Sequence, residues 1–326
     1  MARKKQELGD AMDGENGAVG FAADGKYNYG LDGTQNGQEG VAAADSKQLF
    51  SLPEQAHWVH FWGGESGGVG KSTCCRLMVH YLSEKLKRED FCVIDCDRTK
   101  PDVSNWYGGQ LGERCITSLF SESEELSSEA DAIIEKAMVQ DAIVNLPAQA
   151  FDSFKEWARR NALADVVKEL GIAPVMWFVS DGTPSSLALF ADSMREFGSW
   201  MRHVWVRNYG REKSEVAWQA LEEREAFMKL KPEKTPLLYA SVEMEIAGVS
   251  NFDGAGVSGC FIMNVPAMYA PDRKIFEEEQ KPLKIVAETM RSGKPLFSIR
   301  SRKFLEDVCT QFDIVMTHMG AKNEKF

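Results

Sequence analysis

The sequence predicts a three-layer α/β fold, in which a mostly parallel central sheet is flanked by helices on both faces. Two observations predict it. Short, nearly continuous apolar segments alternate with longer segments of helical apolar period, the pattern of strands that are covered on both faces. A glycine-rich stretch also follows an apolar strand (58–62) and precedes a helix (72–88), which is a strand–loop–helix unit.

The expected elements follow one another from residue 58 to the end of the chain. The strands are short and apolar, and they cover 58–62, 91–95, 141–146, 175–179, 204–207, 237–242 and 261–265. The helices carry apolar residues at helical spacing. They cover 72–88, a segment near 126–138, 150–171, 184–197, 215–230 and 302–319.

Two segments are expected to stand outside this alternation. Residues 1–50 combine recurring glycine with polar residues and have no apolar period, which predicts a disordered tail. Residues 51–326 then form a single domain, with a Gly- and Ser-rich inserted loop at 247–259. This length is sufficient for a large hydrophobic core.

The composition favours a cytoplasmic protein. The net charge of −11 argues against a surface coated with nucleic-acid-binding charge, although a local basic patch stays open. The seven cysteines contain no C-x-x-C pair, and no apolar run follows the basic N-terminal residues. No stretch approaches the roughly 20 apolar residues of a membrane span, so no stable membrane insertion is expected.

The glycine-rich stretch at 58–73, WVHFWGGESGGVGKST, indicates a phosphate-binding loop. Its glycines permit a tight turn whose backbone N–H groups face an anion, and the next helix adds its own N-terminal N–H groups. Lys71 supplies a positive charge and the Ser72 hydroxyl suits Mg²⁺. The pattern G-x-x-x-x-G-K-[ST] is met except at Glu65, which stands where the pattern has glycine. The predicted nucleotide contacts are Gly67, Gly68, Val69, Gly70, Lys71, Ser72 and Thr73.

A second group of candidate residues follows the strand at 91–95. Asp95 and Asp97 lie at its carboxyl end, the edge where open α/β sheets bind ligands. Side chains at i and i+2 of an extended chain point to the same side. Asp95 is predicted to hold a water of a magnesium shell, and Asp97 to orient or deprotonate an attacking water. Two acids in a solvated loop are the alternative.

These motifs together resemble the deviant P-loop ATPases related to ParA and MinD. GGVGKST after an apolar strand and VIDCD carry the resemblance, and DAIVNLPAQ, VMWFVSDGTPSSLALF and VWVRN extend it. Within that superfamily, NLPAQ, WFVSDG and VRNYG are most similar to the plasmid mobilization and conjugal-transfer (TraL-like) branch. The resemblance implies the P-loop NTPase fold, ATP with Mg²⁺, and an ATP-dependent homodimer. It implies catalytic roles for Lys71 and Asp97, metal contacts from Ser72 and Asp95, and adenine recognition by Asn208.

The sequence departs from that superfamily at two positions. Ser66 replaces a signature lysine that reaches the partner's phosphates across the dimer, and serine cannot supply that charge. Lys100 or Arg98 could replace it. Asn145 replaces an acid near the magnesium, and an amide brings no negative charge. Hydrolysis is therefore expected to be slow.

The resulting functional hypothesis is an Mg-dependent ATPase switch that supports plasmid mobilization or conjugal DNA transfer with a relaxase, transfer-machinery or adaptor protein. The alternatives are a ParA-like partition or cargo-positioning ATPase on the nucleoid, and a non-hydrolysing nucleotide-dependent regulator. A basic cluster could bind DNA non-specifically, although neighbouring acids favour an ordinary solvated face. Its members are Arg291, Lys294, Arg300, Arg302 and Lys303. The terminal helix is expected to pack on the core, because a membrane-surface helix would carry more positive charge.

Overall fold

The computed structural model describes residues 57–64, 66–120, 128–224, 238–240, 260–289 and 293–320. The chain divides into two units, Met1–Ala44 and Asp45–Phe326, and every described residue belongs to the second unit. The predicted disordered tail at 1–50 and the predicted inserted loop at 247–259 both lie outside the described residues.

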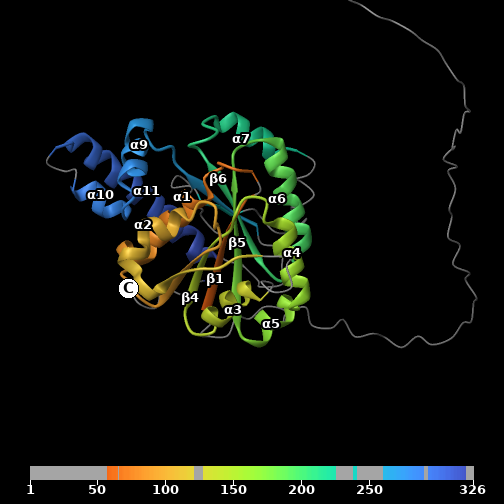
Figure 1. Ribbon diagram of the computed structural model, residues 1–326. Helices are drawn as coiled ribbons and strands as arrows, with labels where there is room; N and C mark the ends of the chain where they lie inside the picture. Colours follow the sequence, from red (N-terminus) through yellow and green to blue (C-terminus); the bar gives the residue numbers. More distant parts are fainter. Residues whose placement is uncertain are drawn as a thin grey trace, which may run out of the picture. The chain divides into compact units, whose positions relative to one another are not determined.

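Eight strands form one sheet in the order β3-β2-β4-β1-β5-β6-β8-β7, and every neighbouring pair is parallel (Figure 1). The strands are β1 (His57–Gly63), β2 (Phe91–Asp95), β3 (Cys115–Thr117), β4 (Asp141–Asn145), β5 (Ile172–Ser180), β6 (Arg202–Asn208), β7 (Leu238–Ala240) and β8 (Cys260–Val265). Because the strands are parallel, all their carboxyl ends meet at one edge. Strand β1 lies between β4 and β5, so its end is central at that edge.

Helices cover both faces of the sheet, as the sequence predicted. One face carries α1 (Lys71–His80), α2 (Asp102–Leu111), α9 (Ala270–Glu279), α10 (Leu283–Thr289) and α11 (Pro295–His318). The other carries α3 (Ala132–Ala137), α4 (Phe151–Arg160), α5 (Leu163–Glu169), α6 (Pro184–Phe197) and α7 (Glu215–Glu222). A π-helical segment, Tyr81–Lys85, continues α1. The short segments Gly112–Arg114 and Glu129–Asp131 are 3₁₀ helices.

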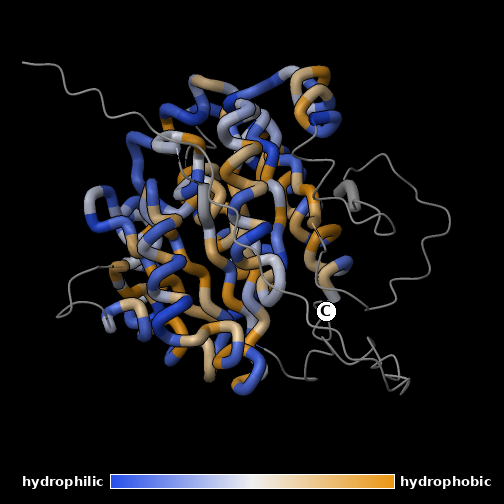
Figure 2. The backbone as a smooth tube through the Cα atoms, turned by 90° about the vertical axis from the view of Figure 1, so that its right-hand side faces the viewer, coloured by the Kyte–Doolittle hydropathy of each residue, from blue (hydrophilic) through white to orange (hydrophobic). Residues whose placement is uncertain are grey.

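Strand β1 shows why the sheet needs two helical layers. Val59 and Phe61 belong to the core under α3–α7, whereas Trp58 and Trp62 belong to the core under α1 and α11, because successive side chains of a strand face opposite sides. Both sets are almost fully buried. The strands are accordingly hydrophobic and the outward turns of the helices largely hydrophilic (Figure 2).

The terminal helix α11 packs on the sheet, as expected. Its Phe312 ring lies edge-on to the stacked indoles of Trp62 and Trp177, at 6.2 and 5.6 Å between ring centroids. Tyr81 stacks on the same phenyl ring and donates a hydrogen bond to Asp313 at 2.8 Å. The helix begins at Pro295 rather than at residue 302, because proline suits a first helical turn.

The predicted helix at 150–171 is wrong, since two helices occupy this stretch. Ala162 has φ 46°, a left-handed conformation, and it separates α4 from α5. The Asn161 side chain stabilises the break by donating to Asp131 Oδ1 (3.2 Å) and to Trp157 O (3.1 Å). The apolar period continues across the break because both helices bury residues in the same core.

One described strand and three described α-helices have no counterpart among the predicted elements. Strand β3 has only three residues, which is too short for an apolar run to be recognised. Helix α2 contains two adjacent glycines, more than half of the residues of α9 are charged, and α10 has only seven residues. Their apolar faces are narrow, and tertiary packing rather than sequence pattern decides their conformation.

Candidate functional site

The glycine-rich loop connects β1 to α1 at the centre of the sheet edge. Gly68 and Gly70 have φ angles of 79° and 107°, values that favour glycine. At Gly70 space is also restricted, because a Cβ there would lie 2.4 Å from Asn208 Nδ2. Glycine is therefore required at the junction between loop and helix.

The N-terminus of α1 is available to an anion. No described side chain caps it, and its first turn contains no acidic residue. The helices that follow the next two strands of the sheet, α6 and α7, instead have N-termini capped by a side chain. Thr183 Oγ1 accepts from Ser186 N in α6 at 3.2 Å, and Ser214 Oγ accepts from Ala217 N in α7 at 3.2 Å. The first N–H groups of α1 carry the positive end of the helix dipole and suit a phosphate.

Lys71 lies folded over this loop. Its side chain is buried, and Nζ donates to Ser66 O at 3.3 Å. The neighbouring Ser72 and Thr73 are half-buried, and Thr73 Oγ1 accepts from Arg76 Nη2 at 3.1 Å. The structure thus brings the predicted nucleotide-contacting residues 67–73 into one turn.

The buried guanidinium of Arg76 connects α1 to α2. It lies over the Trp106 ring, with Cζ 3.5 Å from the centroid, the geometry of a cation–π contact. Burial lowers the pKa of Arg76, and Asp102 opposes that shift. Trp106 therefore packs against the loop helix.

Asn208, at the end of β6, contacts the loop directly. Its Nδ2 donates to Val69 O at 2.6 Å, and its Oδ1 accepts from Gly210 N at 2.9 Å. The predicted adenine-reading residue is thus brought to the loop, where its amide fastens the end of β6 to the backbone before α1. Adenine recognition by Asn208 stays a prediction.

Asp95 and Asn145 form a buried pair at the ends of β2 and β4. Asn145 Nδ2 donates to Asp95 Oδ1 at 2.8 Å. The second oxygen, Oδ2, accepts from Val103 N (3.0 Å) and from the N–H and hydroxyl of Ser104 (2.9 and 3.1 Å). Asp95 therefore caps α2 from outside the helix. A magnesium-bound water would have to displace one of these donors, and the predicted metal role of Asp95 stays a prediction.

The Asn145 side chain keeps one unused acceptor. Its Oδ1 is buried and has no hydrogen-bond partner among the described residues. Asn145 pairs with Trp62 of β1 in the sheet register, so this amide lies beside the strand that enters the loop. A buried acceptor without a donor is costly, and a water or metal-bound water would satisfy it.

Asp97 is less buried than Asp95 and organises the turn that follows β2. Its Oδ1 accepts from Thr99 Oγ1 (2.7 Å) and Lys100 N (3.1 Å), and its other oxygen, Oδ2, accepts no hydrogen bond in the described structure. Lys100 pairs with Asp102 at 3.2 Å, and Arg98 is exposed. In the described ranges, no three His, Cys, Asp or Glu side chains converge to hold a metal ion.

Thiol chemistry has little support at this edge. Burial raises the pKa of Cys75 well above its usual value, and the nearby Asp95 carboxylate raises it further. Burial likewise raises the pKa of Cys96, between the two aspartates. A buried thiol is inert because the thiolate is the nucleophile.

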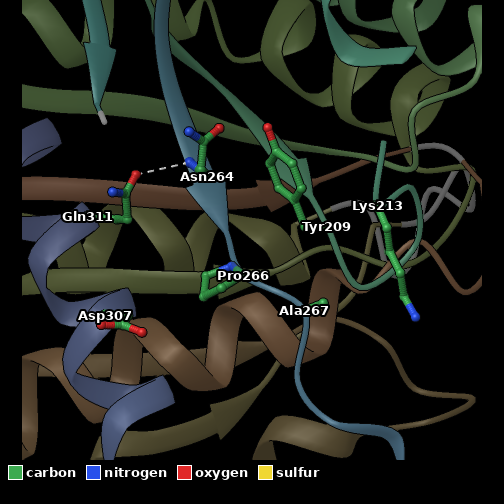
Figure 3. Close-up of a pocket in the computed structure, with 7 residues that line it drawn as sticks. All are labelled: Tyr209, Lys213, Asn264, Pro266, Ala267, Asp307 and Gln311. Atoms are coloured by element: carbon green, nitrogen blue, oxygen red, sulfur yellow. Dashed lines mark hydrogen bonds between the residues drawn. The ribbon is translucent and has the colours of Figure 1, made fainter. Parts of the chain in front are cut away.

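A pocket of about 410 Å³ lies beyond Asn208, between the end of β8 and α11 (Figure 3). Asn264 N donates to Gln311 Oε1 at 3.2 Å and closes one side. Pro266 and Ala267, which follow the end of β8, also line the pocket. The pocket is lined by Tyr209, Lys213, Asn264, Pro266, Ala267, Asp307 and Gln311. Sequence reasoning missed it, because its residues come from three segments far apart in the chain.

Arg211 is a second residue that sequence reasoning missed. It follows the tight turn after Asn208, and its guanidinium Nη2 lies 3.5 Å from the position a Cβ would take on Gly68. The sequence offered a weak signal, a cation three residues after Asn208 in the segment VRNYGR.

The predicted basic cluster near the C-terminus is partly neutralised. Arg300 makes two hydrogen bonds of 2.6 Å to the carboxylate of Asp272, and Arg302 Nε donates to Ser298 O at 3.4 Å. Arg291 lies outside the described residues. DNA binding by this cluster stays a prediction.

Comparisons with known proteins add no identification. No family model matches this chain, and no curated protein matches it. Among the described residues, no helix is long and apolar enough to cross a membrane.

Proposed function

We propose that this protein is an ATP-binding molecular switch that hydrolyses ATP slowly. The observation that carries the proposal is the loop itself. Two glycines with positive φ, a helix N-terminus that no described side chain caps, and the buried Lys71 amine meet at one turn. This combination provides N–H donors and a cation for the phosphates of a nucleotide.

The adjacent pocket supports a nucleotide rather than phosphate alone. Asn208 contacts the loop with its side chain, and the next residue, Tyr209, lines the pocket. A ligand with its phosphates in the loop could place a planar base beside Tyr209 and Pro266. ATP is proposed because the loop and VIDCD resemble the ParA/MinD superfamily.

Magnesium would be held near the same turn, and when bound it would neutralise charge on the phosphates. Ser72 is half-buried at the first turn of α1 and offers its hydroxyl. Asn145 Oδ1, which has no hydrogen-bond partner among the described residues, is a further acceptor for a metal-bound water. The amide lacks the charge of an acid, which fits slow hydrolysis with Asp97 positioning the water.

The experiment is nucleotide binding and turnover by the full chain. Lys71→Ala should weaken ATP binding at least tenfold, because a charged contact to phosphate is lost. Asp97→Ala should preserve binding and lower turnover about tenfold or more. Isothermal titration and phosphate release measure the two effects. Parental binding and turnover in both variants would contradict the assignment.

In the cell, we propose that the switch dimerises with ATP in the cytoplasm and supports plasmid mobilization or conjugal transfer with a relaxase or adaptor protein. The resemblance of NLPAQ and VRNYG to the TraL-like branch supports this role. A partition or cargo-positioning ATPase on the nucleoid is the alternative. A non-hydrolysing nucleotide-dependent regulator is the other alternative, and the absence of charge at both Ser66 and Asn145 supports it.

The dimer is tested by mass in solution. The full chain should be a monomer with ADP and have twice that mass with slowly hydrolysed ATP, because we propose that bound γ-phosphate orders the segments after Asp97 and after Asn145 and so favours the dimer. Lys71→Ala should stay monomeric in both. An unchanged monomer of the parent with bound ATP analogue would contradict the dimer switch and leave nucleotide binding standing.

A further inference from the structure

The turn after β6 places a cation against the glycine-rich loop. Arg211 Nη2 lies 3.5 Å from the position a Cβ on Gly68 would take, and Gly68 is exposed at the outer part of the loop. The distance is ordinary van der Waals contact, so the guanidinium rests beside the loop. Lys71 also contacts this loop, because its Nζ donates a hydrogen bond to Ser66 O.

Contacts on two sides fix the turn that carries Arg211. The Asn208 amide binds Val69 O and Gly210 N, while Arg211 N and Glu212 N both donate to Asn208 O at 2.9 and 3.2 Å. On the other side, Gly182 approaches Glu212 so closely that a Cβ would lie 2.5 Å from the Glu212 Cβ. The turn is therefore held between the loop and the β5–α6 connection.

Two neighbouring cations at this edge, Arg207 and Lys100, are engaged elsewhere. Arg207 is buried and pairs with Glu222 at 2.7 Å, and its Nε donates to Asn264 at 2.7 Å. Lys100 pairs with Asp102. The exposed Arg211 guanidinium makes no hydrogen bond or ion pair with the described part of the chain. An Arg beside N–H donors is suited to phosphate, which it can bind in bidentate fashion.

We propose that Arg211 binds the phosphates of the nucleotide from the same chain and supplies the positive charge that Ser66 cannot. The inference rests on the proposed function and names a residue that the loop pattern does not include. Arg211 joins Lys100 and Arg98 as a candidate for this charge, and its guanidinium lies beside the loop. Its contribution grows with the number of phosphates, because the negative charge beside the guanidinium grows with them.

The test measures dissociation constants of Mg-ATP and Mg-ADP for the full chain and for Arg211→Ala and Arg211→Lys. Arg211→Ala should weaken ATP binding about tenfold and ADP binding less. Arg211→Lys should recover part of the loss. Arg159→Ala is the matched control, since Arg159 is an exposed arginine at the far end of α4, and it should bind both nucleotides like the parent.

Pyrophosphate gives a second readout that is independent of turnover. It should raise the thermal midpoint of the parent and of Arg159→Ala, and raise that of Arg211→Ala distinctly less. Parental affinities in Arg211→Ala, with binding lost in Lys71→Ala, would overturn this inference and leave the proposed function intact. A parent chain that binds neither nucleotide nor pyrophosphate would overturn both.

Discussion

At the scale of single residues, the Asp95 carboxylate caps the N-terminus of α2, although the sequence predicts that it contacts a magnesium shell. Its two oxygens accept from Asn145, from two backbone N–H groups of α2 and from the Ser104 hydroxyl. Asp97 N adds a longer contact at 3.3 Å. An ionised carboxylate offers about four acceptor sites, so these donors saturate it. The N-terminus of α2 depends on this one side chain.

Asp95→Ala should therefore lower the free energy of unfolding by about 2–4 kcal/mol, because it leaves several buried donors without acceptors. Urea unfolding at neutral pH measures the change. Asp95→Asn should also destabilise, since its Nδ2 would face N–H donors. Glu278→Ala removes an exposed acid paired with Lys274 at 3.7 Å and should cost about 0.5 kcal/mol or less. A loss below about 1 kcal/mol in Asp95→Ala would contradict the capping role.

At the scale of elements, strands with a continuous apolar run were predictable, and the three-residue strand β3 was not. Strand β2 and helix α6 have the predicted bounds. The apolar run of β2 ends at acidic residues, and α6 has Thr183 as N-cap and proline at its first turn. The break at Ala162 has no such signal, because neither glycine nor proline marks it.

The candidate site was predictable where it is local in sequence. The loop and its lysine could be identified because a strand, glycines and a helix follow one another at 58–88. The cap that Asp95 makes on α2 joins residues only eight and nine apart, but α2 itself was not predicted. Arg211 and the pocket depend on strand order, which brings β6 and β8 to the edge where β1 ends. No spacing pattern encodes that order.

At the scale of the whole molecule, the core between the sheet and α11 contains a buried histidine. His60 lies between Trp58, at 6.1 Å between stacked rings, and Trp177, whose Nε1 donates to His60 Nδ1 at 3.1 Å. Accepting this bond requires a neutral ring. Burial lowers the pKa of His60 to about 4. The charge of Asp141 acts to raise this pKa, and the charge of Arg88 acts to lower it further. Burial also lowers the pKa values of His203 and His80 to about 4.

These shifts make the stability of the fold depend on pH. The unfolded chain binds a proton at each histidine below its ordinary pKa of about 6.5, whereas the folded chain does not do so until about pH 4. The contribution of each neutral histidine is therefore complete above about pH 6.5 and is lost progressively as the pH falls toward 4. At pH 5 the loss is on the order of 2 kcal/mol for His60.

His60→Gln should remove this part of the pH dependence, because glutamine cannot gain a proton and its Oε1 can still accept from Trp177. The difference in unfolding free energy between pH 7 and pH 5 should shrink by on the order of 2 kcal/mol relative to the parent. Urea unfolding at both pH values measures it. His318→Gln, at an exposed position on α11, controls for the chemical change. If the difference in unfolding free energy between pH 7 and pH 5 is the same in His60→Gln as in the parent, the buried His60 ring is not a source of this pH dependence.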